Sequence, residues 1–188
     1  MNTTMVMGGI AGASPRFKAR AAGVFWLLTI LAGAFALFVG NRIEGGLIAT
    51  ACYTCATVLV YDLLKPVSRS LSALAASFSL VGCALGAMSA LQFVRSPINP
   101  LVLFGLHCLL VGILIFRSTF LPRILGVLLA FGGLGWLTFA SPLLVDYLRP
   151  YNLLPGIIGE LSLTLWLLVV GVNEQQWSER SGRGTEQP

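Results

Sequence analysis

Three polar residues interrupt long apolar runs of this sequence: Glu160, His107 and Tyr53. Glu160 is the one acid in "LLPGIIGELSLTLWLLVV", residues 153–170. A carboxyl, an imidazole and a phenol can each exchange a proton or bind a small polar ligand. In an apolar span such groups are costly, so they face a partner, water or a protein interior. These three residues are therefore a candidate ligand-binding or proton-coupled site.

The composition shows what kind of element must hold these residues. The 188 residues are 56% hydrophobic and only 10% charged, whereas soluble domains carry about 25% charged residues. A water-soluble fold would lack the polar side chains to cover its surface. Six windows are long and apolar enough to cross a bilayer, which takes about 20 residues: 21–39, 45–64, 71–94, 100–116, 124–144 and 153–172.

The sequence thus predicts an all-α polytopic membrane protein, a bundle of six transmembrane helices over residues 21–173. Residues 1–20 and 174–188 are polar or glycine-rich, and we expect both to be disordered. Glycines are dense inside the spans, as in "GGLG" and in "GCALG", where Gly82 and Gly86 are four residues apart. Such spacing lets helix backbones approach closely, which predicts packing inside the bundle, with a homo-oligomer face as the alternative.

Counting along the spans places the three polar residues at one depth. Tyr53, His107 and Glu160 each lie about eight residues inside the second, fourth and sixth spans, which run in the same direction. That offset is about 12 Å, close to the middle of a hydrocarbon core about 30 Å thick. The three side chains meet if these helix faces converge. Such a cluster is either a functional site or a hydrogen-bond network that fixes helix order.

Orientation follows from the basic residues, because cytoplasmic loops are enriched in Lys and Arg. The sequence has twelve Lys and Arg residues. Three of them fall on one side of the predicted membrane: Arg42, Arg95 and Arg149. The other side receives the rest: Arg16, Lys18, Arg20, Lys65, Arg69, Arg117, Arg123, Arg180 and Arg183. We therefore expect both termini in the cytoplasm and a multi-pass protein of the inner (plasma) membrane.

Charged residues at the cytoplasmic ends of the spans have simpler interpretations. Asp62 and Lys65 are three residues apart at the end of the second span, a spacing that predicts a structural ion pair. Arg117 and Arg123 flank "STFLP" between the fourth and fifth spans. We expect these arginines to contact phospholipid headgroups or to fix the topology.

Several other chemistries find no support. Cys52 and Cys55 have C-x-x-C spacing, but thiols inside an apolar helix stay unreactive, and a second such pair is lacking. We therefore predict no metal and no cofactor. The basic residues gather between spans, which explains the net charge of +5 without a nucleic-acid partner. Signatures such as G-x-S-x-G or H-E-x-x-H are missing, so we do not expect an enzyme.

Two hypotheses of function remain ahead of a membrane-embedded enzyme. The first is a non-enzymatic structural or accessory protein, or a binder of a small ligand or lipid. The second is a small transporter or channel-like oligomer that uses the Tyr53, His107 and Glu160 cluster. The composition identifies no ligand.

Three long stretches also resemble a known family. They are "ATACYTCATVLVYDLLKPVSRSLSALAASFSLVGCALGA", "FGLHCLLVGILIFRSTFLPRILGVLLAFGGLGWLTF" and "LLPGIIGELSLTLWLLVVGVN". With "SPRFKARAAGVFWLLTILAGAFALF" they make residues 14–173 similar to the bacterial membrane family called domain of unknown function 4386. The resemblance implies a multi-span inner-membrane protein without assigned chemistry.

This chain departs from the family pattern in two ways. The outer segments "GNRIEGG" and "RSPINP" are shorter than those of family members. Many relatives carry an Asp in the second span and an Arg in the third, where this sequence has Tyr53 and Ser79. An intramembrane ion pair is therefore not expected at that position.

Overall fold

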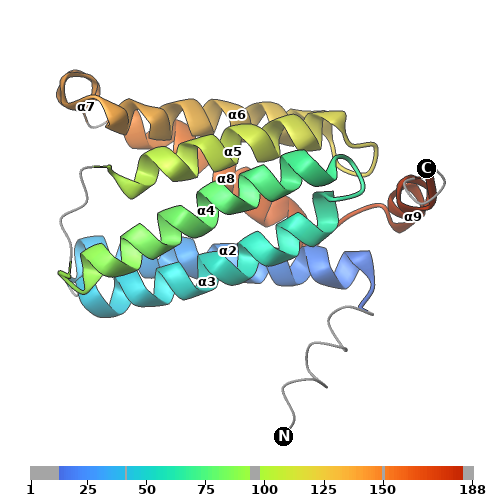
Figure 1. The fold of residues 1–188 in the computed structure, drawn as a ribbon, viewed down its shortest axis with the longest axis horizontal. Coiled ribbons are helices and arrows are strands. Elements are labelled where there is room, and N and C mark those ends of the chain that lie inside the picture. The colour runs from blue at the N-terminus through green and yellow to red at the C-terminus, as the bar shows by residue number, and fades with distance from the viewer. Residues whose placement is uncertain (1–12, 41, 94–97, 150, 184–188) are drawn as a thin grey trace, which may run out of the picture.

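The computed structural model describes residues 13–40, 42–93, 98–149 and 151–183. Six of its helices are long and apolar enough to cross a membrane, which confirms the predicted all-α, six-span architecture (Figure 1). They are α2 (Pro15–Phe38), α3 (Arg42–Leu64), α4 (Arg69–Ala90), α5 (Pro100–Arg117), α6 (Arg123–Leu137) and α8 (Leu154–Val169). The shorter elements are η1 (Thr138–Ala140), α7 (Pro142–Leu148), η2 (Tyr151–Leu153) and α9 (Glu174–Arg183).

Local capping signals set the helix ends, which therefore differ from the apolar windows. Ser14 accepts a hydrogen bond from the amide of Phe17, so α2 begins at Pro15 and not near residue 21. The fifth window was expected to run to residue 144, but α6 ends at Leu137. Pro142 forces Ser141 into an extended conformation, and α7 then begins as a separate helix.

The expected disorder also differs from the structure where it can be compared. Residues 174–183 form α9, although their polar composition predicted a disordered tail. The indole N–H of Trp177 donates to the carbonyl of Leu63 at 2.9 Å, which anchors α9 to the end of α3. Residues 15–20 belong to α2. The rest of the predicted disorder, in residues 1–12 and 184–188, lies outside the described residues.

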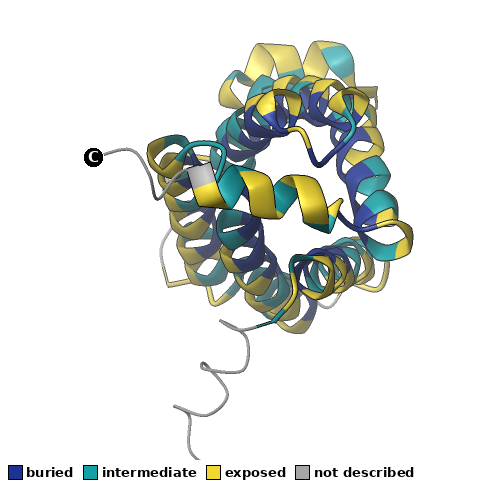
Figure 2. Ribbon diagram, turned by 90° about the vertical axis from the view of Figure 1, so that its right-hand side faces the viewer, coloured by how far each residue is buried: buried dark blue, intermediate teal, exposed yellow. Residues whose placement is uncertain are grey.

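The six long helices form a closed ring. Each helix packs against the next along the chain, and α8 packs back against α2. Figure 2 looks along the ring from the α9 end, with α9 crossing in front and buried segments facing inward. For description, α2, α3 and α4 are the first unit, and α5, α6 and α8 are the second unit. We call the two ends of the ring the α9 end and the α7 end.

Glycines allow the closest contacts in the second unit. A Cβ atom on Gly112 of α5 would lie 2.6 Å from the carbonyl oxygen of Gly126 on α6. One on Gly159 of α8 would lie 2.5 Å from the carbonyl oxygen of Leu128. Gly82 on α4 faces the ring of Phe104 on α5. These small residues therefore serve packing inside the bundle, as their spacing predicted.

Burial in the first unit is concentrated between the α9 end and mid-depth. The buried residues of α2 run from Lys18 to Trp26, and those of α4 from Ser72 to Cys83. On α3 the buried side chains begin at Tyr53 and continue to Leu64. The two units are thus packed most tightly on the α9 side of Tyr53.

The glycine contacts generate the first prediction. Gly112→Ala should lower the free energy of unfolding by about 1–3 kcal/mol, because the added methyl forces α5 and α6 apart. Gly33→Ala on α2 is the matched control, since a Cβ there meets no atom within 4 Å. It should be neutral or stabilising by up to about 1 kcal/mol through helix propensity. The free energy of unfolding of both variants can be measured in bicelles. Equal values for the two variants would contradict the close packing of α5 against α6.

Candidate functional site

Glu160 lies in the interior of the ring, where three neutral groups donate hydrogen bonds to its carboxylate. The indole N–H of Trp136 donates to Oε1 at 2.8 Å, and that of Trp26 donates to Oε2 at 3.2 Å. The thiol of Cys108 lies 3.6 Å from Oε1. Glu160 itself is 9% exposed. One carboxylate of α8 therefore connects to α2, α5 and α6.

The electrostatics of this carboxylate are unusual for a buried acid. Indole and thiol groups donate hydrogen bonds but carry no positive charge. The ion pairs found among the described residues, Lys18 and Lys65 with Asp62, lie at the α9 end and do not involve Glu160. Within the described part of the chain, the site therefore holds an acid by hydrogen bonds and without a basic side chain in contact.

The structure brings the three polar residues that the sequence singled out into one cluster around Trp26. The ring centroid of Trp26 is 5.6 Å from that of Tyr53 and 6.2 Å from that of His107. The Tyr53 and His107 rings are 5.8 Å apart. We define the central cluster as these residues with the groups around Glu160: Trp26, Tyr53, His107, Cys108, Trp136 and Glu160.

A backbone carbonyl orients His107. Its Nδ1 lies 2.9 Å from the carbonyl oxygen of Ala75 on α4. A carbonyl oxygen only accepts hydrogen bonds, so Nδ1 carries the proton when the ring is neutral. The other nitrogen, Nε2, is then the acceptor. His107 is 2% exposed, so its free lone pair faces the protein interior.

Three buried hydroxyls have no hydrogen-bond partner among the described residues: Tyr53, Ser72 and Thr164. Burying a hydroxyl without a partner costs about 1–3 kcal/mol. The interior of the ring thus has more polar groups than its own side chains satisfy.

A neutral pair stands near the place where relatives were expected to carry opposite charges. The hydroxyls of Thr57 on α3 and Ser79 on α4 are 2.6 Å apart and fully buried. They join the two helices without a charge.

Asp62 has two basic partners at the α9 end. Lys65 donates to one carboxylate oxygen, as the spacing along α3 predicted, and Lys18 of α2 donates to the other at 2.5 Å. The Lys18 side chain is 7% exposed and that of Lys65 is 45% exposed. The Lys18 contact was not predicted, and it ties α2 to α3.

The two arginines of the α5–α6 connection lie on the surface. Arg117 and Arg123 are both exposed, and the guanidinium of Arg123 lies 5.7 Å from the centre of the Phe116 ring. They lie apart from the central cluster. Contact with phospholipid headgroups stays a prediction.

Trp26 and Trp136 are the main residues that sequence reasoning missed. Tryptophan in membrane proteins favours the interface, yet Trp26 lies in the interior of its span and is 1% exposed. A buried indole N–H needs an acceptor. Glu160 is the one acid deep in any span, so a mid-span tryptophan was a signal for this contact.

A known protein family matches the second unit of this chain. Residues 98–171 match the family described as "Domain of unknown function (DUF4386)". The expected resemblance is confirmed over these residues. The DUF4386 segment contains α5, α6 and α8, and so it carries Glu160, Trp136, His107 and Cys108. Trp26 and Tyr53 come from outside it.

A relative in the archaeon Archaeoglobus fulgidus is 29% identical over 123 residues. The alignment covers 61% of this chain and 74% of that protein, which is described as an uncharacterized protein. No solved structure matches. The comparisons therefore show a likeness to a family of unknown function over residues 98–171 and assign no reaction.

The indole contact can be tested by a double-mutant cycle. Trp26→Phe keeps an aromatic ring but removes the donor, so it should couple to Glu160→Gln by about 0.5–3 kcal/mol in unfolding free energy. The matched pair is Trp166→Phe with Glu160→Gln, because Trp166 packs against the core elsewhere on α8. That pair should be additive within about 0.5 kcal/mol. Additive effects in both cycles would show that Trp26 and Glu160 do not interact.

The two lysines of Asp62 should differ in importance. Lys18→Met breaks a largely buried pair and should cost about 3 kcal/mol of unfolding free energy. Lys65→Met removes an exposed partner and should cost less than about 1 kcal/mol. Chemical unfolding of the two variants in detergent micelles measures both values. Equal losses would mean that Lys18 is not the main partner of Asp62.

Proposed function

We propose that this is a non-enzymatic, multi-pass protein of the inner (plasma) membrane that takes up a proton at Glu160 and couples it to a small polar solute. Both termini and the α9 end would face the cytoplasm, because nine of the twelve Lys and Arg residues fall on that side. This is the transporter hypothesis of the sequence analysis. The geometry of Glu160 favours it over a purely structural role.

The observation that carries the proposal is a buried acid with neutral donors and no basic partner in contact. An ionised carboxylate at mid-depth costs several kcal/mol unless something compensates its charge. Hydrogen bonds from Trp26, Trp136 and Cys108 stabilise the anion in part. A proton compensates the charge fully and needs no cavity. Glu160 is therefore suited to exchange one.

The three donors are divided unequally between the two carboxylate oxygens. Oε1 faces both Trp136 and Cys108, whereas Oε2 faces Trp26 alone. A proton on Oε2 thus weakens one hydrogen bond, while a proton on Oε1 would weaken two. Protonation should therefore occur at Oε2 and weaken the bond to Trp26.

The hydrogen bond from Trp26 to Glu160 is the one of the three that joins the two units. Trp136 and Cys108 belong to the second unit, as Glu160 does, but Trp26 belongs to the first unit. Loss of the Trp26 contact would therefore loosen one unit from the other without disturbing the second unit itself. A proton at Glu160 would in this way bias how the two units meet.

The arrangement of the units supports a carrier rather than a scaffold. Each unit has three spans joined in sequence, so the two units have opposite orientations in the membrane. Many carriers consist of two inverted units with the substrate site near the midplane between them. Glu160 has this position. Binding a lipid, or fixing helix order alone, would not need an exchangeable acid there.

Infrared spectroscopy of the protein in lipid bilayers tests proton uptake at Glu160. A change of pH should produce a protonated-carboxyl band in the wild type that is missing in Glu160→Gln. Asp146→Asn, an acid-to-amide change at an exposed residue of α7, is the matched control and should leave the band in place. Dissipation of a pH gradient in pyranine-loaded vesicles with valinomycin should be faster with wild type than with Glu160→Gln.

One result would contradict proton exchange at Glu160. If Glu160→Gln folds and leaves both the band and the gradient unchanged, Glu160 does not exchange protons. Its contacts would then only hold the helices together, as in the structural or accessory hypothesis.

A further inference from the structure

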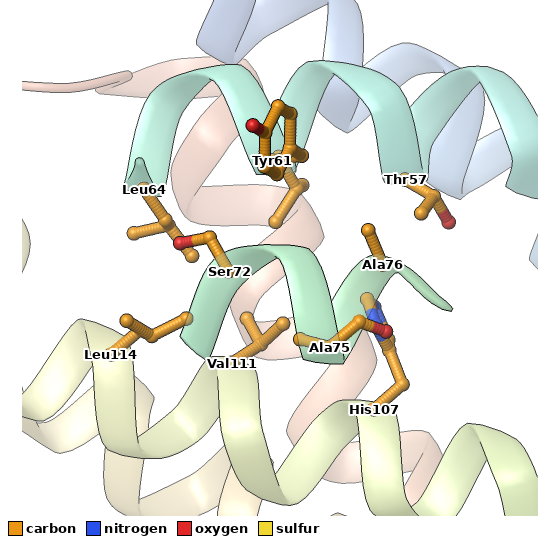
Figure 3. A pocket seen from close by; sticks show the side chains of 10 residues that line it. Thr57, Tyr61, Leu64, Ser72, Ala75, Ala76, His107, Val111 and Leu114 are labelled. Carbon is orange, nitrogen blue, oxygen red and sulfur yellow. The ribbon is translucent and has the colours of Figure 1, made fainter. Parts of the chain in front are cut away.

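Two cavities of the bundle differ greatly in size. One lies between α3, α4 and α5, with Thr57, Ser72 and His107 on its wall (Figure 3), and its volume is about 10 Å³. That is about the space that one water molecule requires. The other opens at the α9 end and measures about 510 Å³. Because pockets for small ligands measure about 300–1,000 Å³, the larger cavity has room for an organic ligand.

The larger cavity is formed where several helices begin or end. Its wall consists of the first turns of α2 and α9, the last turn of α8 and the connection between α5 and α6. We call it the α9-end site. The ends of membrane spans lie at the level of the lipid headgroups, where tryptophan is favoured, and Trp166 is one of the lining residues. The α9-end site is therefore placed at the boundary between headgroups and hydrocarbon.

Hydrogen bonds hold the walls of the α9-end site in place. The amide of Asn173 donates to the carbonyl of Phe120 at 3.3 Å, which joins the α8–α9 connection to the α5–α6 connection. Gly171 turns the chain between α8 and α9 with a φ of 77°, in the left-handed region that favours glycine. The amide of Arg16 donates to Oε1 of Glu174 at 3.3 Å, which joins α2 to α9. The chain therefore forms this site by its own contacts.

Two opposite charges lie close together on the wall of the site. The side chain of Arg16 runs over Gly171, where an added Cβ would lie 3.2 Å from Cγ of the arginine. Its guanidinium forms no ion pair with a carboxylate of the described residues. Glu174 uses Oε1 for the amide of Arg16, which leaves Oε2 as an acceptor. The α9-end site thus presents a cation and an anion that do not neutralise each other.

We propose that the α9-end site binds a phospholipid whose headgroup carries a phosphate and a primary amine, with the phosphate at Arg16 and the ammonium at Glu174. A guanidinium donates two parallel hydrogen bonds to a phosphate, and an ammonium donates to a carboxylate. Each charge of the site is then neutralised by the opposite charge of one headgroup. The inference goes beyond the proposed function, because the site lies at the end of the ring and does not include Glu160.

The apolar part of the wall favours a lipid over a soluble molecule with the same charges. Leu121, Pro122 and Val170 line the site, and Val170 is 45% exposed. Phe17, which follows Arg16 in α2, is 61% exposed. Acyl chains attached to the headgroup would lie against these side chains, whereas a soluble zwitterion would leave them uncovered.

Native mass spectrometry of the purified protein with defined lipids tests the headgroup. The probes are phosphatidylethanolamine, phosphatidylcholine and phosphatidylglycerol with identical acyl chains, added at equal concentration. Choline has no N–H to donate, and a glycerol headgroup offers Glu174 no positive charge. We expect phosphatidylethanolamine to bind about tenfold more tightly than either of the others, the effect of one hydrogen bond between charged groups.

Variants assign the two charges to their roles. Glu174→Gln should abolish the preference for the amine, and the glutamine can still accept from the amide of Arg16, so the fold is retained. Arg16→Gln removes the phosphate contact and should weaken binding of all three lipids. The matched controls are Glu179→Gln on α9 and Arg117→Gln on α5, which change exposed residues outside the site. Both controls should keep the wild-type preference.

Three results would overturn the inference. They are equal binding of the three lipids to the wild type, a preference that persists in Glu174→Gln, and equally tight binding of glycerophosphoethanolamine, which has the headgroup without acyl chains. The comparison of lipids on the wild type needs no variant, so it decides the question even if a variant fails to fold. None of these results depends on proton uptake at Glu160, and failure of either proposal leaves the other standing.

Discussion

The carboxylate of Glu160 is the contact on which the arrangement of the ring depends. It accepts hydrogen bonds from α2 and α6, and the thiol of α5 lies beside it. In hydrocarbon an acid cannot be left without partners, so the rotation of α8 about its axis is restricted to angles that bring Glu160 to these donors. Gly159 of α8 also faces α6, where a Cβ would lie 2.5 Å from the carbonyl oxygen of Leu128. A single polar residue and a few small ones therefore fix the second unit.

The same carboxylate makes the two units unequal partners. The second unit holds Glu160 through two donors of its own, and the first unit contributes one. Contacts within the second unit also bring backbones closest together, at Gly112 and Gly159. The second unit thus has the closer internal packing. At the central cluster, the first unit contacts it through Trp26, which lies against His107 and Glu160. A change of charge on Glu160 would therefore affect its single bond to the first unit more than its two bonds within the second unit.

Much of this fold follows from the sequence, because hydropathy reports directly on the number and length of the spans. Depth also follows from counting residues, which is why Tyr53, His107 and Glu160 could be expected at one level. Rotation does not follow from counting. Which face of α2 turns inward depends on side-chain packing with α3 and α8, and so Trp26 and Lys18 were not anticipated. The same holds for α9, whose composition is that of a solvated tail but whose Trp177 finds the Leu63 carbonyl.

The closure of the ring has a consequence for how the protein is made. Trp26 and Glu160 are 134 residues apart in the chain, and the ring closes where α2 packs against α8, the last span. During synthesis α2 therefore enters the membrane long before its acceptor exists, with a buried lysine and an indole still awaiting partners. Asp62 reaches the lysine as soon as α3 is inserted, but the indole waits for α8. The ring is thus closed by its last span, and a chain that stops short of α8 would leave α2 and α6 without the helix that packs between them.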